Sequence, residues 1–220
     1  MTTPHALAVP ITASPLTAEA FGDLARRRLL PTPAEPSESS PSDFELNPDA
    51  ASMASQTLRA AAVLVPIIAR REPTVLLTVR TEGLAAHAGQ IAFPGGRIEP
   101  VDQGPLAAAL REAKEEIGLD ADFVEPLGFL EPYRTGTGFL ITPAVALVRP
   151  QFVLTPDTSE VADVFEAPLG FLMDGANHRI DRRFWRGADR SFYAIQFEQR
   201  YIWGATAGIL KALHRRLFEA

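Results

Sequence analysis

Three glutamates, Glu112, Glu115 and Glu116, follow one another at the i, i+3 and i+4 spacing that places side chains next to each other on a helix. On a helical wheel drawn at about 100° per residue from Leu106, the three carboxylates fall between about 180° and 280°. The apolar residues of the segment fall within about 60° of one direction: Leu106, Ala109, Leu110, Ala113 and Ile117. The spacing predicts a helix over residues 105–118 that packs one face inward and gathers three carboxylates on the other.

Carboxylates this close repel one another, and a hard divalent cation removes that conflict. Oxygen ligands of this kind suit Mg²⁺ or Mn²⁺, with the remaining coordination positions left for water and substrate phosphates. Arg111 can pair with one glutamate and fix its rotamer, while Gly95 and Gly96 let the backbone approach closely enough for a main-chain carbonyl to bind the metal. The alternative is a solvated charged face, which is the commoner meaning of a glutamate cluster on a helix.

The composition is that of an ordinary globular protein, with 46% hydrophobic and 22% charged residues in a chain of 220. A net charge of −6 argues against a broad nucleic-acid surface, which needs clustered Lys and Arg. The absence of cysteine excludes disulfides, thiolate zinc sites and cysteine nucleophiles. No apolar run reaches the ~18 residues that span a bilayer, and residues 1–15 lack the pattern of a secretory signal. We therefore expect a cytoplasmic protein with no membrane partner.

The first part of the chain differs from the rest. Residues 17–30 predict a short helix with Thr17 as N-cap, and residues 31–49 are rich in Pro, Ser and Glu with too few apolar side chains to build a core. They form either an extended linker or a strap across the domain. We therefore expect an N-terminal helix and extension over residues 1–55 and one globular domain over residues 56–220.

Within that domain, apolar runs predict several strands. Residues 62–69 and 74–80 predict a hairpin, and Pro66 suggests that its first strand is an edge or carries a bulge. Further strands are expected over residues 127–133, 139–148 and 191–197, followed by a helix over residues 205–218. Strands around one central helix, with another helix at the end, predict an α/β sandwich with a mixed sheet.

The glutamate helix also resembles a known motif. The segment REAKEEIGL at residues 111–119 matches the second half of the Nudix box, G-x5-E-x7-R-E-U-x-E-E-x-G-U, which here begins at Gly96. In the first half the expected Glu falls on Gln103, and one inserted residue places Asp102 in its stead. Asp102 either supports the site from behind or caps the helix.

A second motif resembles the coenzyme A pyrophosphatase branch of the Nudix family. Its upstream pattern, L-L-T-x-R-[ST]-x3-R-x3-G-x3-F-P-G-G, is matched in register by LLTVRT at residues 76–81, by Gly89 and by FPGG at residues 93–96. The second arginine of the pattern is replaced by Ala85. The segments EVADVFEAPL at 160–169 and YIWGATA at 201–207 also resemble that branch.

The resemblance implies a Nudix-like α/β/α sandwich and a metal-dependent hydrolase that cuts coenzyme A, or a derivative, into 3′,5′-ADP and 4′-phosphopantetheine. It implies Mg²⁺ or Mn²⁺ as cofactor and, since Nudix relatives are often dimers, a homodimer. The expected residues are as follows: the Gly96 carbonyl, Glu112, Glu115 and Glu116 as metal ligands; Arg111 as an orienting partner; Arg80, Thr81, His87 and Gly89 at the substrate. Glu160 is the candidate general base, with a solvent-facing loop charge as the alternative.

Two other functions remain open. Ala85 favours a Nudix enzyme that acts on ADP-ribose or another nucleoside diphosphate derivative. A non-catalytic nucleotide sensor is the third possibility, although all three glutamates of the box are retained.

Overall fold

The computed structural model describes residues 16–37, 39–53, 57–81, 89–185 and 187–219. The helices are α1 (Ala18–Arg28), α2 (Pro105–Ile117), the short α3 (Leu169–Leu172) and α4 (Ala205–His214), which continues into the π-helical turn Arg215–Glu219; 3₁₀ turns lie at Pro48–Met53, Ala121–Phe123 and Gly175–Asn177. None of the helices in these ranges has the length and apolar character needed to cross a membrane.

Two sheets accompany these helices. The larger contains β1 (Arg59–Ile68), β2 (Thr74–Arg80), β3 (Ile91–Ala92), β4 (Gly95–Arg97), β5 (Val124–Phe129), β6 (Tyr133–Arg134), β7 (Phe139–Val148) and β8 (Val161–Pro168). Its order is β3-β2-β1-β7-β5, with β4 paired to β1, β6 to β7 and β8 to β2. The smaller sheet has the order β11-β10-β9, from β9 (Arg179–Trp185), β10 (Ala188–Phe197) and β11 (Arg200–Trp203). The larger sheet is mixed because β1 and β7 run parallel while its other pairings are antiparallel.

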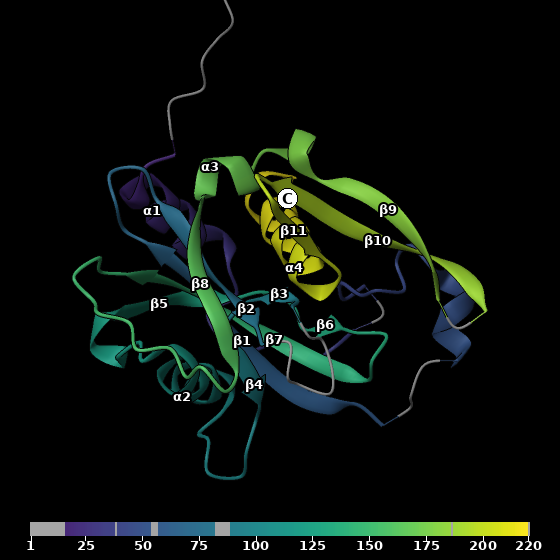
Figure 1. Cartoon of the computed structure of the whole chain (residues 1–220), viewed down its shortest axis with the longest axis horizontal. Helices are drawn as coiled ribbons and strands as arrows, with labels where there is room; N and C mark the ends of the chain where they lie inside the picture. The colour runs from purple at the N-terminus through teal and green to yellow at the C-terminus, as the bar shows by residue number, and fades with distance from the viewer. Residues whose placement is uncertain (1–15, 38, 54–56, 82–88, 186, 220) are drawn as a thin grey trace, which may run out of the picture.

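Helices cover both faces of the larger sheet, so the molecule is an α/β/α sandwich (Figure 1). Alternating residues of β1 divide between two apolar clusters: Leu64 packs with α2, and Ile67 packs with α1 and α4. In the neighbouring strand, Leu76 and Leu77 divide in the same way. This is the period-two pattern of a strand buried on both faces. The expected fold class, a sandwich around a mixed sheet, is confirmed.

The hairpin of β1 and β2 is confirmed, but the expectation drawn from Pro66 is wrong. Strand β1 is central, with β7 on one side and β4 and then β2 on the other. On that second side Leu64 donates its N–H to the Pro94 carbonyl at 2.9 Å, and pairing with β2 begins at Ile67. The backbone nitrogen of Pro66 points to the same side of β1 as the Leu64 N–H, into the gap between β4 and β2. Its missing N–H therefore removes no bond from the ladder, which is why a central strand tolerates it.

The N-terminal segment lies against the domain as a strap. Thr17 caps α1 by accepting the Ala20 N–H at 3.2 Å, as expected, and Phe21 is fully buried in the same cluster as α4. Further along, the Asp43 carboxylate accepts the Tyr133 hydroxyl at 2.9 Å and the Gly136 N–H at 2.7 Å. Of the two alternatives for residues 31–49, the structure shows the strap.

Several elements were not predicted. The strands β3 and β4 are too short to give a periodic pattern, and β9 and β11 carry charged residues that hide their alternation. The predicted strand over residues 127–133 is divided into β5 and β6. The final helix keeps α geometry only to His214 and then widens into the π turn.

Candidate active site

Glu116 is the buried centre of the glutamate cluster. It is only 5% exposed, and its Oε2 accepts the Gly95 N–H at 3.1 Å. The Arg80 Nη1 lies 3.7 Å from its Oε1. Burial raises the pKa of Glu116 to about 7, and the negative charges of Glu112 and Glu160 add to that effect against the opposing pull of Gly95 and Arg80. A carboxylate in such surroundings gains stability when it binds either a proton or a cation.

Glu112 lies one turn earlier, directly against the backbone of β4. A Cβ added at Gly96 would come within 2.4 Å of the Glu112 carboxyl carbon, so any larger residue there would displace this carboxylate. A Cβ at Gly95 would meet the Ala62 carbonyl oxygen at the same distance. Burial also raises the pKa of Glu112, although its hydrogen bond to Arg111 opposes the shift. The two glycines thus bring a bare strand edge up to two carboxylates, as the sequence suggested.

Arg111 connects the helix to the turn before it. Its Nε and Nη2 each donate to the Asp102 carboxylate at 3.0 Å, in a bidentate pair. Its Nη1 donates to Glu112 Oε1 at 3.0 Å and to Glu115 Oε2 at 2.9 Å. The Arg111 contact holds the pKa of Asp102 below its usual value. Since Gly104, and not Asp102, stands at the N-cap of α2, Asp102 supports the site from behind and does not cap the helix.

The expectation that all three glutamates share one outward face is wrong. The Glu115 side chain is 60% exposed, but those of Glu112 and Glu116 are 17% and 6% exposed. The cause is the strand edge of Gly95 and Gly96, which has no side chains and leaves room for two carboxylates to pack against it. A helical wheel describes only the helix itself, so it cannot show that a glycine strand such as β4 packs against one side.

The loop before β8 docks on the end of α2. Asp157 and Thr155 donate their N–H groups to the carbonyls of Glu116 and Ile117, each at 2.9 Å. Gly118 ends the helix at φ +71°, where a Cβ would lie 2.9 Å from the Thr155 nitrogen. This docking brings Glu160 close enough for its charge to raise the pKa of both Glu112 and Glu116.

The residues of the upstream motif meet this loop from the other side. The Thr81 N–H donates to the Glu160 carbonyl at 2.9 Å, and its hydroxyl donates to the Ser159 carbonyl at 3.0 Å. Gly89 has φ +68° and donates its N–H to the Arg80 carbonyl at 3.1 Å. The structure therefore gathers Arg80, Thr81, Gly89 and Glu160 beside the glutamates. His87 lies outside the described residues.

Two neighbours of the site were not singled out from the sequence. The Gly95 N–H is a donor to Glu116, a role that a glycine in a motif does not reveal. Asp157 accepts both the N–H and the hydroxyl of Ser159, at 2.8 and 2.7 Å, and so shapes the loop that carries Glu160. The D-x-S spacing of an Asx turn was the available signal for the second.

The donor set fits a hard divalent cation. The Glu116 carboxylate is buried and that of Glu112 is partly buried; both have raised pKa values, and the Gly96 backbone lies against Glu112. Among the described residues, no three acidic or histidine side chains already stand around one point with the spacing of a metal site. In this arrangement Arg111 bonds Glu112 and Glu115, and Arg80 stands beside Glu116. The chemistry of the ligands is in place, and the arginines occupy some of their oxygens.

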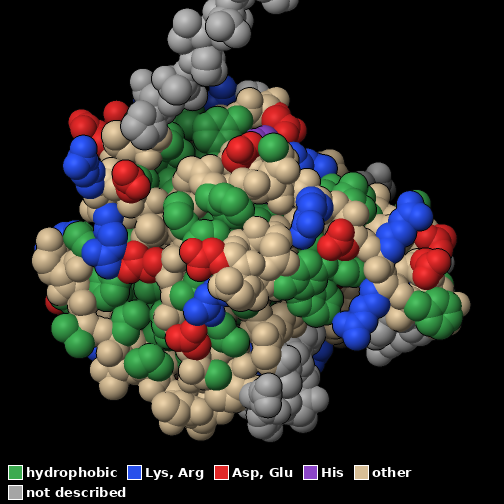
Figure 2. Space-filling model, turned by 45° about the horizontal axis from the view of Figure 1, so that its top comes forward, with side chains coloured by type: hydrophobic (Ala, Val, Ile, Leu, Met, Phe, Trp, Pro, Cys, Tyr) green, Lys and Arg blue, Asp and Glu red, His purple; other side chains and the backbone are tan. Residues whose placement is uncertain are grey.

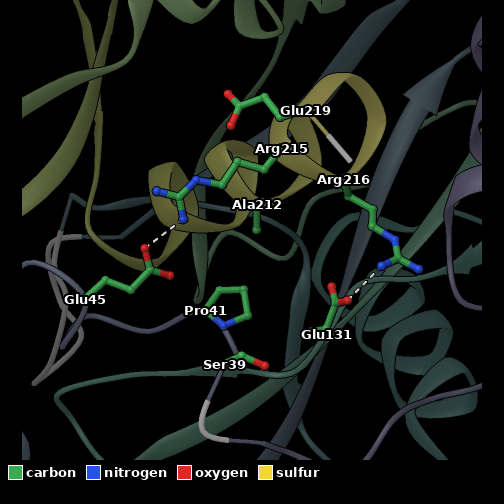
Figure 3. A pocket seen from close by; sticks show the side chains of 8 residues that line it. All are labelled: Ser39, Pro41, Glu45, Glu131, Ala212, Arg215, Arg216 and Glu219. Carbon is green, nitrogen blue, oxygen red and sulfur yellow. Dashed lines mark hydrogen bonds and ion pairs between the residues drawn. The ribbon is translucent and has the colours of Figure 1, made fainter.

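A separate pocket of about 360 Å³ lies between the strap and the end of α4 (Figure 3). Figure 3 shows Arg215 pointing toward Glu45 of the strap and Arg216 toward Glu131, with ion-pair distances of 2.7 and 3.0 Å. The pocket shares no lining residue with the glutamate site. Both of its arginines thus have a carboxylate partner, and its third carboxylate, Glu219, pairs with Lys211 outside the lining.

The fold and the glutamate helix define a protein class that comparison with known proteins identifies. A family model of the NUDIX domain matches residues 58–179, and the chain belongs to the Nudix family. It is 41% identical over 163 residues to the uncharacterized Nudix hydrolase NudL of Yersinia pestis and to that of Yersinia pseudotuberculosis, covering 74% of this chain and 82% of each relative. The solved Ap4A hydrolase of C. elegans is 19% identical, with a TM-score of 0.42, over 51% of this chain and 81% of its own. The protein is thus a Nudix hydrolase, a family that generally uses divalent metal ions and small nucleotide-derived substrates.

Proposed function

We propose that this Nudix hydrolase cuts the diphosphate of coenzyme A or one of its derivatives, giving 3′,5′-ADP and 4′-phosphopantetheine. One observation carries the proposal: Arg80, from the upstream motif that resembles the coenzyme A branch, lies 3.7 Å from Glu116 of the Nudix box. Two motifs that are separate in sequence thus meet at one place. A guanidinium there suits the oxygens of a diphosphate.

Glu112, Glu115, Glu116 and the Gly96 carbonyl would hold Mg²⁺ or Mn²⁺. When bound, the metal neutralises diphosphate oxygens and lowers the pKa of a water ligand. In this proposal Arg111 orients Glu112 and Glu115, because its guanidinium already bonds both side chains.

The chain's other residues bind the substrate and move the proton. Arg80 would contact a phosphate oxygen, while Thr81 and Gly89 fix the backbone around it through the bonds to Ser159 and to Arg80 itself. His87 is assigned to the same subsite by the motif. Glu160 would accept a proton from the attacking water as the oxygen joins one phosphorus and the bridging oxygen leaves with the other. Its nearness to Glu112 and Glu116, whose pKa values it raises, supports this role.

The division of the chain follows from this assignment. Residues 56–220 would form the catalytic domain, and residues 1–55 an extension that packs on it through α1 and the strap. Removing residues 1–50 should leave the glutamate site chemically intact and lower stability, because Phe21 and Asp43 are then lost from the interior.

The direct test is a substrate panel with product identification by mass. The purified protein is incubated with coenzyme A, ADP-ribose, NADH and diadenosine polyphosphates, each with Mg²⁺, Mn²⁺ or chelator. Release of 3′,5′-ADP from coenzyme A, abolished by chelator, is the expected result. No cleavage of coenzyme A under any metal condition would overturn the substrate assignment.

Ala85 favours a second candidate. It replaces an arginine of the coenzyme A motif, so a substrate that needs fewer cationic contacts, such as ADP-ribose or another nucleoside diphosphate derivative, is the alternative. An Ala85→Arg variant separates the two, since it should improve coenzyme A hydrolysis relative to ADP-ribose hydrolysis only if coenzyme A occupies this position. A nucleotide sensor would bind one of these compounds and cleave none of them.

A further inference from the structure

Strand β9 forms an outer edge of the smaller sheet. Its one partner among the described strands is β10, to which it is paired from Arg179 to Trp185. In Figure 1 the β9–β10 hairpin reaches away from the body of the molecule, with β9 along the outer margin. An edge of this kind presents unpaired N–H and C=O groups to another strand.

Strand β9 exposes two large apolar side chains among its charged ones. Ile180 is 56% exposed and Phe184 is 70% exposed, and both stand on the same face of the strand because their spacing is even. Within the part of the chain that the structure describes, neither Arg182 nor Arg183 has an ion-pair partner. Figure 2 shows hydrophobic, basic and acidic side chains close together on the lobe that projects to the right. Exposed apolar side chains on a free edge mark a surface for another chain.

The sequence of β9 is complementary to itself when the strand is turned around. In an antiparallel pair centred on Arg182, Ile180 stands opposite Phe184 and Asp181 stands opposite Arg183. The apolar pairs fall on one face and the ion pairs on the other, each occurring twice. Opposite side chains in such a pair are near enough to interact.

Neighbouring registers lose this match. A two-fold axis perpendicular to the sheet must lie midway between one residue and its own copy, because opposite side chains share a face. Centred on Asp181, the pairing puts that carboxylate against its own copy; centred on Arg183, it puts Arg182 against Phe184 and Arg183 against itself. The favoured register also has one like-charge pair, Arg182 against its own copy, but this pair shares its face with the two Phe184 rings, whose faces can accept guanidinium groups.

We propose that β9 is the surface through which two copies of this chain form a two-fold dimer. The two three-stranded sheets become one continuous sheet across the axis. The Asp181 carboxylate is held on the strand by the Tyr201 hydroxyl at 2.6 Å, so it is positioned before the partner's Arg183 arrives. This inference is independent of the substrate.

The first test uses the absence of cysteine from the chain. Opposite residues of an antiparallel pair have Cα atoms about 4.5–5.5 Å apart, within the roughly 4.4–6.8 Å of a disulfide. Arg182→Cys should therefore form a disulfide-linked dimer under mild oxidation. Asp189→Cys, at an exposed position on β10, is the matched control and should stay largely monomeric. Equal cross-linking of the two variants would overturn the proposal.

The second test is a charge exchange measured by sedimentation equilibrium. Asp181→Arg and Arg183→Asp should each raise the dissociation constant of the dimer by about tenfold or more, and the double exchange should restore it. Tyr201→Phe controls for loss of the hydrogen bond to Asp181. Phe184→Asp should also produce monomers that keep the far-ultraviolet spectrum of the wild type. A monomeric wild-type protein, or a dimer that all three single variants leave intact, would show that β9 is not the interface.

Discussion

The glutamate site and the pocket at the end of α4 use the same side-chain types but balance their charges differently. In the pocket each arginine has a carboxylate of its own, Arg215 with Glu45 and Arg216 with Glu131, and the pairs are partly open to solvent. At the site, the carboxylate of Glu116 is buried and that of Glu112 is partly buried. The charge of Glu112 raises the pKa of Glu116, and the charge of Glu160 raises the pKa of both.

The difference indicates that the pocket's ion pairs attach the strap, whereas the carboxylates of the site are suited to bind a cation. Matched, half-exposed pairs such as those of the pocket contribute little to stability, typically about 0–1 kcal/mol each, and here they tie the strap to α4. A buried excess of negative charge destabilises the fold unless something else compensates it. A divalent cation is the natural compensation for the carboxylates of the site.

The largest expected effect is on activity at the centre of this excess. Glu116→Gln should reduce kcat/KM on the order of 10³-fold, because a lost metal contact removes several kcal/mol of transition-state stabilisation. Glu45→Gln, at the pocket, should change kcat/KM by less than about twofold. Steady-state kinetics at saturating metal measures both. An unchanged rate in the Glu116 variant would remove the distinction between the two regions.

Glu160 should show the next largest effect. Glu160→Gln should lower kcat by about 10²-fold, at the lower end of what a general base contributes. If the residue takes a proton from water, the acidic limb of the pH–rate profile should also flatten. Asp163→Asn, an exposed carboxylate further along β8, is the control and should leave that limb unchanged. A uniform loss at every pH would instead mean that Glu160 acts through the charge it places near the other glutamates.

Arg111 should show a smaller effect of a different kind. Arg111→Lys keeps the charge but cannot form the fork that joins Asp102, Glu112 and Glu115, so kcat should fall by roughly tenfold. The metal concentration for half-maximal activity should shift as the glutamates lose their fixed orientation. Arg215→Lys is the corresponding change in the pocket and should affect neither quantity. Equal effects of the two substitutions would mean that Arg111 is structural only.

The smallest expected effect is on stability, at the strap. Burial raises the pKa of Asp43, so the folded protein binds its proton more tightly than the unfolded chain does. The stabilisation from this proton is fully present below the unfolded pKa and is lost as pH rises through the higher folded pKa. The free energy of unfolding of the wild type relative to Asp43→Asn should therefore fall over that rise. Urea denaturation at several pH values measures this difference. If the wild type instead became more stable relative to Asp43→Asn as pH rises, folding would lower the pKa of Asp43.

Much of the site was readable from the sequence because it is local. The carboxylates, Arg111 and Gly118 lie within one helix and its end, where spacing alone sets which side chains meet. The predicted helix over residues 105–118 differs from α2 by one residue at its end. The hairpin of β1 and β2 was predictable for the same reason, since a short turn joins two apolar runs.

The predictions that were wrong or left open concern contacts between segments that are distant in the sequence. Pro66 suggested an edge because a strand's partners are not written in its own sequence, and the gap between β4 and β2 exists only in the assembled sheet. Glu116 was expected on the outward face because the wheel contains no β4. The strap was left open, and β9 and β11 of the small sheet were missed, although β10 confirms the strand expected over residues 191–197. The packing of these segments depends on α4 and β6 rather than on their own composition.

The sequence by itself determined which groups are the candidates for the chemistry: the carboxylates of the Nudix box, the arginine of the upstream motif and the glycines between them. Only the tertiary structure decided the burial, the pKa shifts and the relative positions of these groups. It buried Glu116, left Glu115 at the surface and drew Glu160 to the end of α2. The physical reason is that a side chain's type and spacing are local properties. The water and charge around it depend on segments that are distant in the chain, and those set its pKa.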